Sequence, residues 1–192
     1  HDPSSEQSWA YDLWRDTDRS GVRLKYQDLR QSLEIEESIG LRENSIAIEV
    51  STSIHNPNPE KRRFKYWTIA FAPVDPSSRI LVPADFVTDH AGQNTLYWPV
   101  ERGMDKSNVE SWKRDDSLFA PRPYSGFAAM ISEKEQTGFV RIFPRETARG
   151  VKLYCDGNAG YMDTYGGMGR TMEEWLWIEP GQTFSWTEYY YP

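Results

Sequence analysis

The C-terminal third of the sequence most constrains the fold, because short runs of β-branched and aromatic residues alternate there with Gly and Pro. Two such runs, 172–179 and 182–191, are joined through Pro180 and Gly181, a pair typical of turns. They predict a β-hairpin or a tight corner between two strands. Along the second run, one parity is mainly apolar and the other carries hydroxyl groups: Phe184, Trp186, Glu188 and Tyr190, against Thr183, Ser185, Thr187 and Tyr189.

The same period of two recurs upstream and predicts further antiparallel strands. Residues 33–41 and 46–54 alternate on either side of a polar turn at 42–44, which indicates a half-buried hairpin. Residues 64–74 are apolar on both parities, which is typical of a strand buried on both faces or crossing between sheets. Strands are also expected over 127–132, 138–143 and 151–156. From these strands we expect nine side chains to be mostly buried: Ile46, Ile48, Val50, Ile69, Phe71, Ile142, Leu153, Leu176 and Phe184.

Helical signals are weak throughout the chain. The pattern allows a helix over 107–113, and no helical pattern is long enough to form the crossover between two parallel strands. The sequence therefore predicts an all-β fold, an antiparallel β-sandwich of two large sheets. We expect a single domain over 1–192, in which 1–19 form an irregular or briefly helical lead-in pinned to the body by its aromatic residues.

Charge and hydropathy exclude two classes of partner. The net charge of −7 argues against nucleic acid, because phosphate binding needs a basic surface. No apolar run approaches the roughly 18 residues that span a bilayer, so no membrane partner is expected. Cys155 alone neither requires nor excludes an oxidising compartment. A start at His1 fits a removed leader, an excised piece or a tag remnant; a secreted or periplasmic location is favoured over a cytoplasmic one, and the oligomeric state is left open.

Motifs for metal, cofactor or nucleophile chemistry are missing. Three His and one Cys give no zinc spacing, and the Asp residues follow no EF-hand pattern. No Gly-x-Ser-x-Gly elbow occurs, and residues 166–169 lack the Lys-Ser/Thr of a phosphate loop. We therefore expect neither a metal nor a cofactor.

Aromatic residues are unusually frequent, with eight Trp and eleven Tyr. Amphipathic rings are often used at binding surfaces. Trp98 and Trp112 lie in a segment punctuated by Pro, Gly, Asp and Asn, so each is either a stacking platform for a ligand or a plug in the core. Trp67 lies in a predicted strand, where packing in the core or on a sheet face is the default, and it is kept as a binding candidate.

A resemblance to galactose mutarotase-like proteins, which include aldose epimerases, covers about residues 20–192. Its first part is the apolar hairpin, the Asn-containing loop at 54–58, the Trp67 strand and Pro83 after an apolar triplet. Its second part is the tail with Tyr161 to Asp163, Gly166-Gly167, the Pro180-Gly181 corner and the final aromatic strand. The resemblance implies a β-supersandwich that binds sugars in a concave sheet face.

Epimerases of this family use a carboxylate base and a His acid to open and reclose the sugar ring. The resemblance places Asp163 at the carboxylate, where Glu is usual, and no His lies on the strand with Trp67. His90 is the candidate acid. Each residue has an ordinary alternative: Asp163 can be a satisfied carboxylate beside Gly166-Gly167, and His90 a surface loop residue. If Asp163 and Met162 alternate, Asp163 faces the ligand side and Met162 the core.

Three functions follow from these features. The first is a carbohydrate-binding domain that uses Trp67, Trp98, Trp112 and Asp163. The second is an aldose epimerase or another carbohydrate-active enzyme with Asp163 and His90 as its proton-transfer pair. The third is an assembly domain whose aromatic residues line a protein interface.

Overall fold

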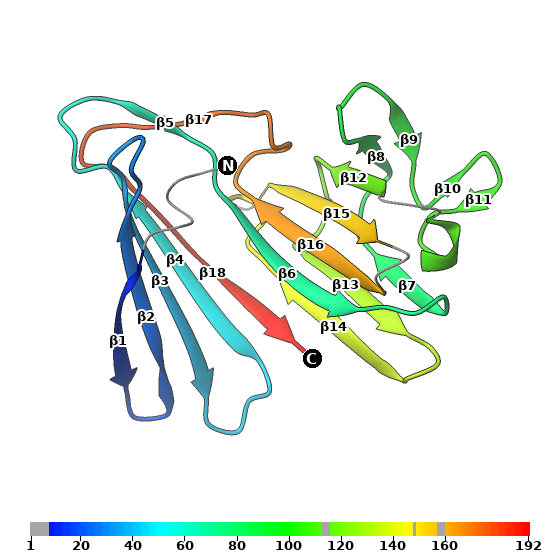
Figure 1. Ribbon diagram of the computed structural model, residues 1–192, viewed down its shortest axis with the longest axis horizontal. Coiled ribbons are helices and arrows are strands. Elements are labelled where there is room, and N and C mark those ends of the chain that lie inside the picture. Colours follow the sequence, from blue (N-terminus) through cyan, green and yellow to red (C-terminus); the bar gives the residue numbers. More distant parts are fainter. Residues whose placement is uncertain (1–7, 113–115, 148, 157–159) are drawn as a thin grey trace. The chain divides into compact units, whose positions relative to one another are not determined.

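A computed structural model describes residues 8–112, 116–147, 149–156 and 160–192 (Figure 1). The regular secondary structure of the described residues is almost entirely antiparallel strand, as the alternation predicted. It divides into two compact units. Unit 1 comprises residues 1–64 and 175–191, and unit 2 comprises residues 65–174 with Pro192.

Unit 1 is built on five antiparallel strands that pair in the order β1-β2-β3-β4-β18. Their bounds are β1 Ala10–Arg15, β2 Arg19–Gln27, β3 Glu34–Arg42, β4 Ile48–His55 and β18 Thr183–Tyr191. The predicted hairpin is confirmed, with Ile39 opposite Val50. A smaller pair joins β5 (Arg62–Phe64) to β17 (Leu176–Ile178). Because β17 and β18 pair with different strands, Pro180-Gly181 forms the corner that was one of the two alternatives, with Gly181 at a φ of 69°.

The lead-in is a strand, so its prediction as irregular or helical is wrong where the structure describes it. Residues 1–7 lie outside the described part. Strand β1 pairs along its whole length with β2, and this pairing satisfies its backbone N–H and C=O groups. The polar side chains of the segment gave no sign of this backbone pairing. Two of its aromatic residues contact the neighbouring strands, since the rings of Trp9 and Tyr26 lie 4.1 Å apart and Trp14 lies on Gly40, whereas Tyr11 is 73% exposed.

The sheet of unit 1 has two chemically different faces. On β18, the predicted division into an apolar and a hydroxyl-bearing parity agrees with the register against β4. Trp186 and Glu188 are buried on the apolar side, where the Glu188 carboxylate accepts bonds from Trp186 Nε1 at 3.1 Å and Tyr190 OH at 2.6 Å. The opposite side is called the hydroxyl face below. Its row across β3, β4 and β18 includes Ser38, Ser51 and Thr187.

Unit 2 contains a six-stranded sheet, in the order β6-β16-β15-β12-β8-β9, and a second group in which β13 pairs with β7 and β14. The six strands are β6 Trp67–Pro73, β16 Tyr161–Gly167, β15 Gly150–Asp156, β12 Asp116–Ala120, β8 Phe86–Asp89 and β9 Thr95–Tyr97. The others are β7 Ser78–Leu81, β13 Phe127–Ser132, β14 Thr137–Ile142, and the short pair β10 Val100–Glu101 and β11 Met104–Asp105. The helix allowed over 107–113 is reduced to a 3-10 turn, η2 (Val109–Ser111); Lys113 lies outside the described residues. No helix in the described part is long and apolar enough to span a bilayer.

The core of unit 2 draws on both groups of strands and includes Trp98 and Trp112. Their side chains are only 9% and 3% exposed. Each indole nitrogen donates to a carbonyl oxygen, from Trp98 to Val82 at 3.1 Å and from Trp112 to Lys106 at 2.7 Å. The core-plug alternative is therefore the one seen, and these residues are not stacking platforms. A Pro- and Gly-punctuated segment can still contribute to a core when its own carbonyl groups satisfy the indoles.

Several of the expected core residues lie at the surface. Of the nine, Leu153 is fully buried, whereas five are substantially exposed: Ile46 70%, Ile48 41%, Ile69 44%, Phe71 63% and Ile142 41%. Of the two alternatives for residues 64–74, burial on both faces is wrong, whereas passage between sheets is seen, because the segment runs from β5 at Phe64 to β6 in the six-stranded sheet. Strand β6 is the edge of its sheet, pairs only with β16, and turns one parity away from the core. Apolar residues on both parities do not reveal that one face is open.

Candidate functional site: an aromatic sheet face around Asp163

Aromatic side chains gather on the outward face of the six-stranded sheet of unit 2. Asp163 on β16 lies opposite Phe71 on β6 and Tyr154 on β15, and the next row of the same parity pairs Tyr165 with Ile69 and Lys152. We call this surface the Asp163 face, defined by Trp67, Phe71, Phe119, Lys152, Tyr154, Tyr161, Asp163 and Tyr165. Met162 is fully buried in the core on the other side, which confirms the expected alternation.

Asp163 is a buried and only partly satisfied carboxylate. It is 4% exposed, and its Oδ2 accepts a bond from the Tyr165 hydroxyl at 3.2 Å. Its Oδ1 is buried without a hydrogen-bond partner among the described residues. Burial raises the pKa of Asp163, against the lowering effects of the Tyr165 bond and the Lys152 charge. The alternative of a fully satisfied carboxylate beside Gly166-Gly167 is therefore not what the structure has.

Tyr165 is held as a proton donor. Burial, followed by the charge of Asp163, raises its pKa to about 12. The phenol is therefore protonated at neutral pH, and it can only donate to the carboxylate beside it. This hydrogen bond satisfies Oδ2 of Asp163 and leaves Oδ1 as the acceptor without a partner among the described residues.

Lys152 is a functional candidate that the sequence did not single out. It is 7% exposed, and its Nζ lies 4.3 Å from the ring centre of Tyr165 and 6.0 Å from those of Phe119 and Tyr154. Its Nζ also donates to Met172 Sδ at 3.8 Å. Burial lowers the pKa of Lys152, opposed by the charge of Asp163. The sequence signal for Lys152 was its position in the middle of the apolar strand Gly150–Asp156. That signal is weak, because a lysine in a strand can also have its charged end in solvent.

Trp67 lies at the far end of this face, flat against β16. A Cβ at Gly167 would come within 2.3 Å of the Trp67 ring, so glycine is what lets the indole approach the backbone. The ring meets Phe119 edge-on at 5.9 Å. Its Nε1 is buried and has no hydrogen-bond partner within the described ranges. Trp67 is therefore placed on the same face as Asp163, with an unsatisfied donor to match the unsatisfied acceptor.

His90 belongs to the same side of the sheet but lies apart from Asp163. Its Nδ1 bonds Ser117 Oγ at 3.1 Å, and its ring lies 5.8 Å from Phe119. Strands β15 and β12 separate β16 from β8, so three strand spacings, roughly 14 Å, lie between the two residues. A proton-transfer group must reach its atom directly or through one water. His90 and Asp163 are therefore not placed to act on one sugar ring together.

The Asp163 face combines one exposed ring and several partly buried rings with scarce polar groups. Phe71 is 63% exposed and packs edge-on against Tyr161 at 6.1 Å. Such a surface can stack against the C–H face of a ring while a few donors and acceptors fix its orientation. Among the described residues, no group of three or more His, Cys, Asp or Glu is arranged to hold a metal ion.

Comparison with known proteins identifies the fold. No family model and no curated protein matches the sequence. A TPR-domain containing protein from Parabacteroides distasonis superposes with a TM-score of 0.84 at 17% identity, over 96% of this chain and 34% of that one. A putative aldose 1-epimerase from Escherichia coli K12 gives a TM-score of 0.73 at 11% identity, over 96% of this chain and 68% of that one.

A galactose mutarotase-like protein from Clostridium acetobutylicum has a TM-score of 0.68 at 12% identity, over 95% of this chain and 65% of that one. This chain thus spans about a third of the length of the Parabacteroides protein and about two thirds of the length of the other two. Identities this low establish the fold alone. The chain therefore has the galactose mutarotase-like β-sandwich fold that its sequence resembles.

Proposed function

We propose that this protein binds a carbohydrate on the Asp163 face. The observation that carries the proposal is the pair of buried, unsatisfied polar atoms on that face, Trp67 Nε1 and Asp163 Oδ1. A buried donor or acceptor without a partner costs about 1–3 kcal/mol, so a ligand that supplies both partners recovers that loss. Sugar hydroxyls can donate and accept at once.

The surroundings of these two atoms favour a neutral ligand of two or more sugar rings. Trp67 lies opposite Gly167, four residues from Asp163 along β16, which is roughly 13 Å of strand. Tyr165 lies between them on the same parity. Aromatic side chains dominate this stretch, and the buried charges of Lys152 and Asp163 are of opposite sign. The face thus has little net charge with which to attract an anion.

Aldose epimerisation is a second candidate, favoured by one observation. The pKa of Asp163 is raised and that of Lys152 is lowered, both mainly by burial, which moves each group toward the range useful for proton transfer. Lys152 would then replace His90 as the partner of Asp163. Binding demands less of the site than catalysis, so the binding proposal stands without it. An anomerisation assay on glucose and galactose, with Lys152→Met as the variant, tests this candidate.

Calorimetric titration with neutral disaccharides of glucose, galactose, mannose and xylose tests the binding proposal. We expect Asp163→Asn, which keeps an acceptor oxygen, to weaken binding modestly, and Asp163→Ala to weaken it about tenfold, equivalent to one hydrogen bond of about 1.4 kcal/mol. Asp85→Asn is the matched control, because Asp85 is exposed and lies outside this face.

The proposal is wrong if none of the four sugars binds the wild-type protein. It is also wrong if both Asp163 variants bind the best sugar as tightly as the wild type does. If the wild-type protein instead self-associates through the exposed ring of Phe71, the assembly alternative replaces carbohydrate binding.

A further inference from the structure

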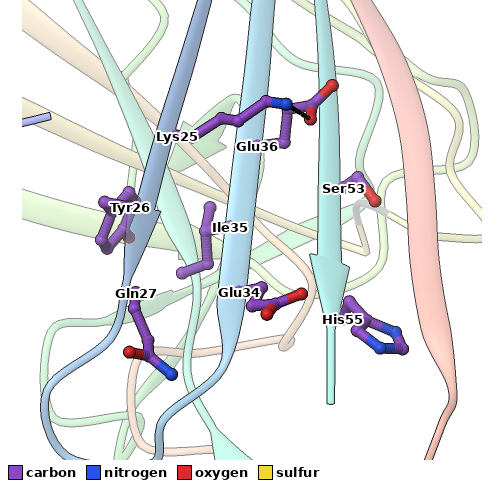
Figure 2. Close-up of a pocket in the computed structure, with 8 residues that line it drawn as sticks. All are labelled: Lys25, Tyr26, Gln27, Glu34, Ile35, Glu36, Ser53 and His55. Atoms are coloured by element: carbon purple, nitrogen blue, oxygen red, sulfur yellow. Dashed lines mark ion pairs between the residues drawn. The ribbon is translucent and has the colours of Figure 1, made fainter. Parts of the chain in front are cut away.

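The hydroxyl face of unit 1 carries a second surface that the Asp163 face does not explain. Three pockets of about 500, 260 and 360 Å³ lie along strands β2 and β3. The first is shown in Figure 2, where Lys25, Glu36 and Ser53 come from the three neighbouring strands β2, β3 and β4. Glu34 and His55, which are opposite each other in the register, lie at its end.

The three pockets follow one another along β3 and are together called the groove. Glu36 lies opposite Lys25 and Ser53 in the first pocket, and one row further on the same parity Ser38 lies opposite Arg23 and Ser51 in the second. The second and third pockets share Asp16, Arg19 and Leu41. The groove follows β3 from Glu34 to Arg42, a length of roughly 26 Å. It is therefore shaped for an extended chain rather than for a single compact ring.

The charges along the groove are balanced, and several of them are already paired. Arg23 meets Glu36 at 3.1 Å and Asp12 at 3.4 Å, and Lys25 meets Glu36 at 3.2 Å. Five basic and six acidic side chains line the three pockets: Arg15, Arg19, Arg23, Lys25 and Arg42, with Asp16, Asp18, Glu34, Glu36, Glu43 and Glu49. A polyanion would need a surplus of positive charge. This lining instead offers donors and acceptors in equal supply.

Hydroxyl groups and one indole complete the groove. Ser51 Oγ bonds Thr187 Oγ1 at 2.8 Å, and Ser185 Oγ bonds Ser53 Oγ at 3.3 Å. Trp14 lines the second pocket, and it lies so close to Gly40 that a Cβ there would be 2.8 Å from its Cζ2. Its Nε1 is buried without a hydrogen-bond partner in the described part of the chain. A ring for stacking and an unused donor therefore lie in the middle part of the groove, beside its hydroxyl groups.

We propose that this groove binds a linear, uncharged oligosaccharide along β2 and β3. Such a ligand matches the length of the groove, its balanced charge and its mixture of donors, acceptors and one stacking ring. The site lies in unit 1 and shares no residue with the Asp163 face. It therefore stands or falls independently of the proposed function.

Amide chemical shifts of the isotopically labelled protein test the proposal with uncharged hexasaccharides of glucose, xylose, mannose and N-acetylglucosamine. At least one hexasaccharide should shift amides of β2, β3 and β4, and its trisaccharide should bind about tenfold more weakly because fewer rows are filled. Trp14→Ala should weaken hexasaccharide binding about tenfold. Leu13→Ala is the matched control, since Leu13 neighbours Trp14 on the opposite parity and is 80% exposed.

A groove-filling variant, Ser38→Gln, should block the hexasaccharide without removing the edge strand to which Trp14 belongs. Asp163→Asn should leave hexasaccharide shifts in unit 1 unchanged, which separates this proposal from that for the Asp163 face. The proposal is overturned if none of the four hexasaccharides shifts these amides. Equal losses in the Trp14 and Leu13 variants, or salt-dependent binding of a heparin fragment in place of the neutral sugars, also overturn it.

Discussion

The two open sheet faces of this protein handle charge in opposite ways. On the hydroxyl face of unit 1, ionised groups are paired and about half exposed, as in the contact of Arg23 with Glu36. On the Asp163 face of unit 2, Lys152 and Asp163 are almost fully buried among aromatic rings. Burial shifts the pKa of each toward its neutral form. Exposed ion pairs change the free energy of folding little, whereas burial of charged groups destabilises the fold.

This difference indicates that the Asp163 face carries the larger cost in stability. A half-exposed ion pair contributes little and is easily replaced, so the groove of unit 1 owes its character to shape and hydroxyl groups. A buried carboxylate with an unsatisfied oxygen persists only where the surroundings hold it. The Asp163 face is therefore the more specialised of the two, and its residues should respond more strongly to substitution.

We expect the largest change in stability from a substitution in the core of unit 2, compared with a substitution at its surface. Trp98→Ala should lower the free energy of unfolding by about 3–5 kcal/mol, because it empties a core site. Tyr97→Ala changes the adjacent residue, which is 78% exposed, and should cost less than about 0.5 kcal/mol. Urea denaturation measures both. Similar losses in the two variants would mean that Trp98 is not a core residue.

Gly167→Ala should displace the Trp67 ring, which lies directly on Gly167 in the Asp163 face. The added methyl group collides with the Trp67 ring, so we expect a loss of about 1–3 kcal/mol in stability together with weaker sugar binding. The double variant Gly167→Ala, Trp67→Ala removes the collision. Its loss of stability in urea denaturation should be smaller than the sum of the two single losses. Additive losses would contradict the close contact.

Removing the charge of Asp163 should change how stability depends on pH. Because the folded-state pKa is raised above its ordinary value, the ionised carboxylate costs stability, and the cost develops as pH rises from about 4 through the folded pKa. Asp163→Asn lacks this cost. Its stability relative to wild type should therefore increase with pH and then level off above the folded pKa, as measured by urea denaturation at a series of pH values. A relative stability that is constant with pH would show that the carboxylate is not desolvated.

The groove should show the smallest effect. Glu36→Gln breaks contacts with Arg23 and Lys25, yet these pairs are well exposed, so the loss should stay below about 1 kcal/mol and shrink further in high salt. Lys152→Met is the comparison on the other face, where removal of a buried charge leaves Asp163 without its opposing charge. Denaturation in low and high salt distinguishes the two. A larger, salt-insensitive loss for Glu36→Gln would erase the contrast between the faces.

Sequence patterns predicted the strands better than the faces. Alternation located β3, β4, β13 and β18, and it assigned Met162 and Asp163 to opposite sides, because a period of two is fixed by backbone geometry. It could not show that β6 is an edge strand, since Ile69 and Phe71 look the same whether a second sheet or solvent covers them. Strand pairing over long sequence separations decides that question.

The candidate site was predicted in part for the same reason. Trp67 and Asp163 were both named as binding candidates, and the strand register places them on one face, but Trp98 and Trp112 were assigned by their loop-like surroundings and prove to be core residues. Lys152 was missed because a lysine in a strand is usually exposed. Its role depends on rings from β12, β15 and β16 that only the fold brings together.

The indole N–H resonance of Trp67 tests the central claim most directly. Trp67→Phe identifies this signal among the eight indoles, and the sugar that binds best in calorimetry is then added to the labelled protein. The account predicts that the Trp67 signal shifts as the sugar saturates, because Nε1 gains a hydrogen-bond partner, and that Asp163→Ala weakens the response. A Trp67 signal that stays in place while the sugar is bound would contradict the assignment of carbohydrate binding to the Asp163 face.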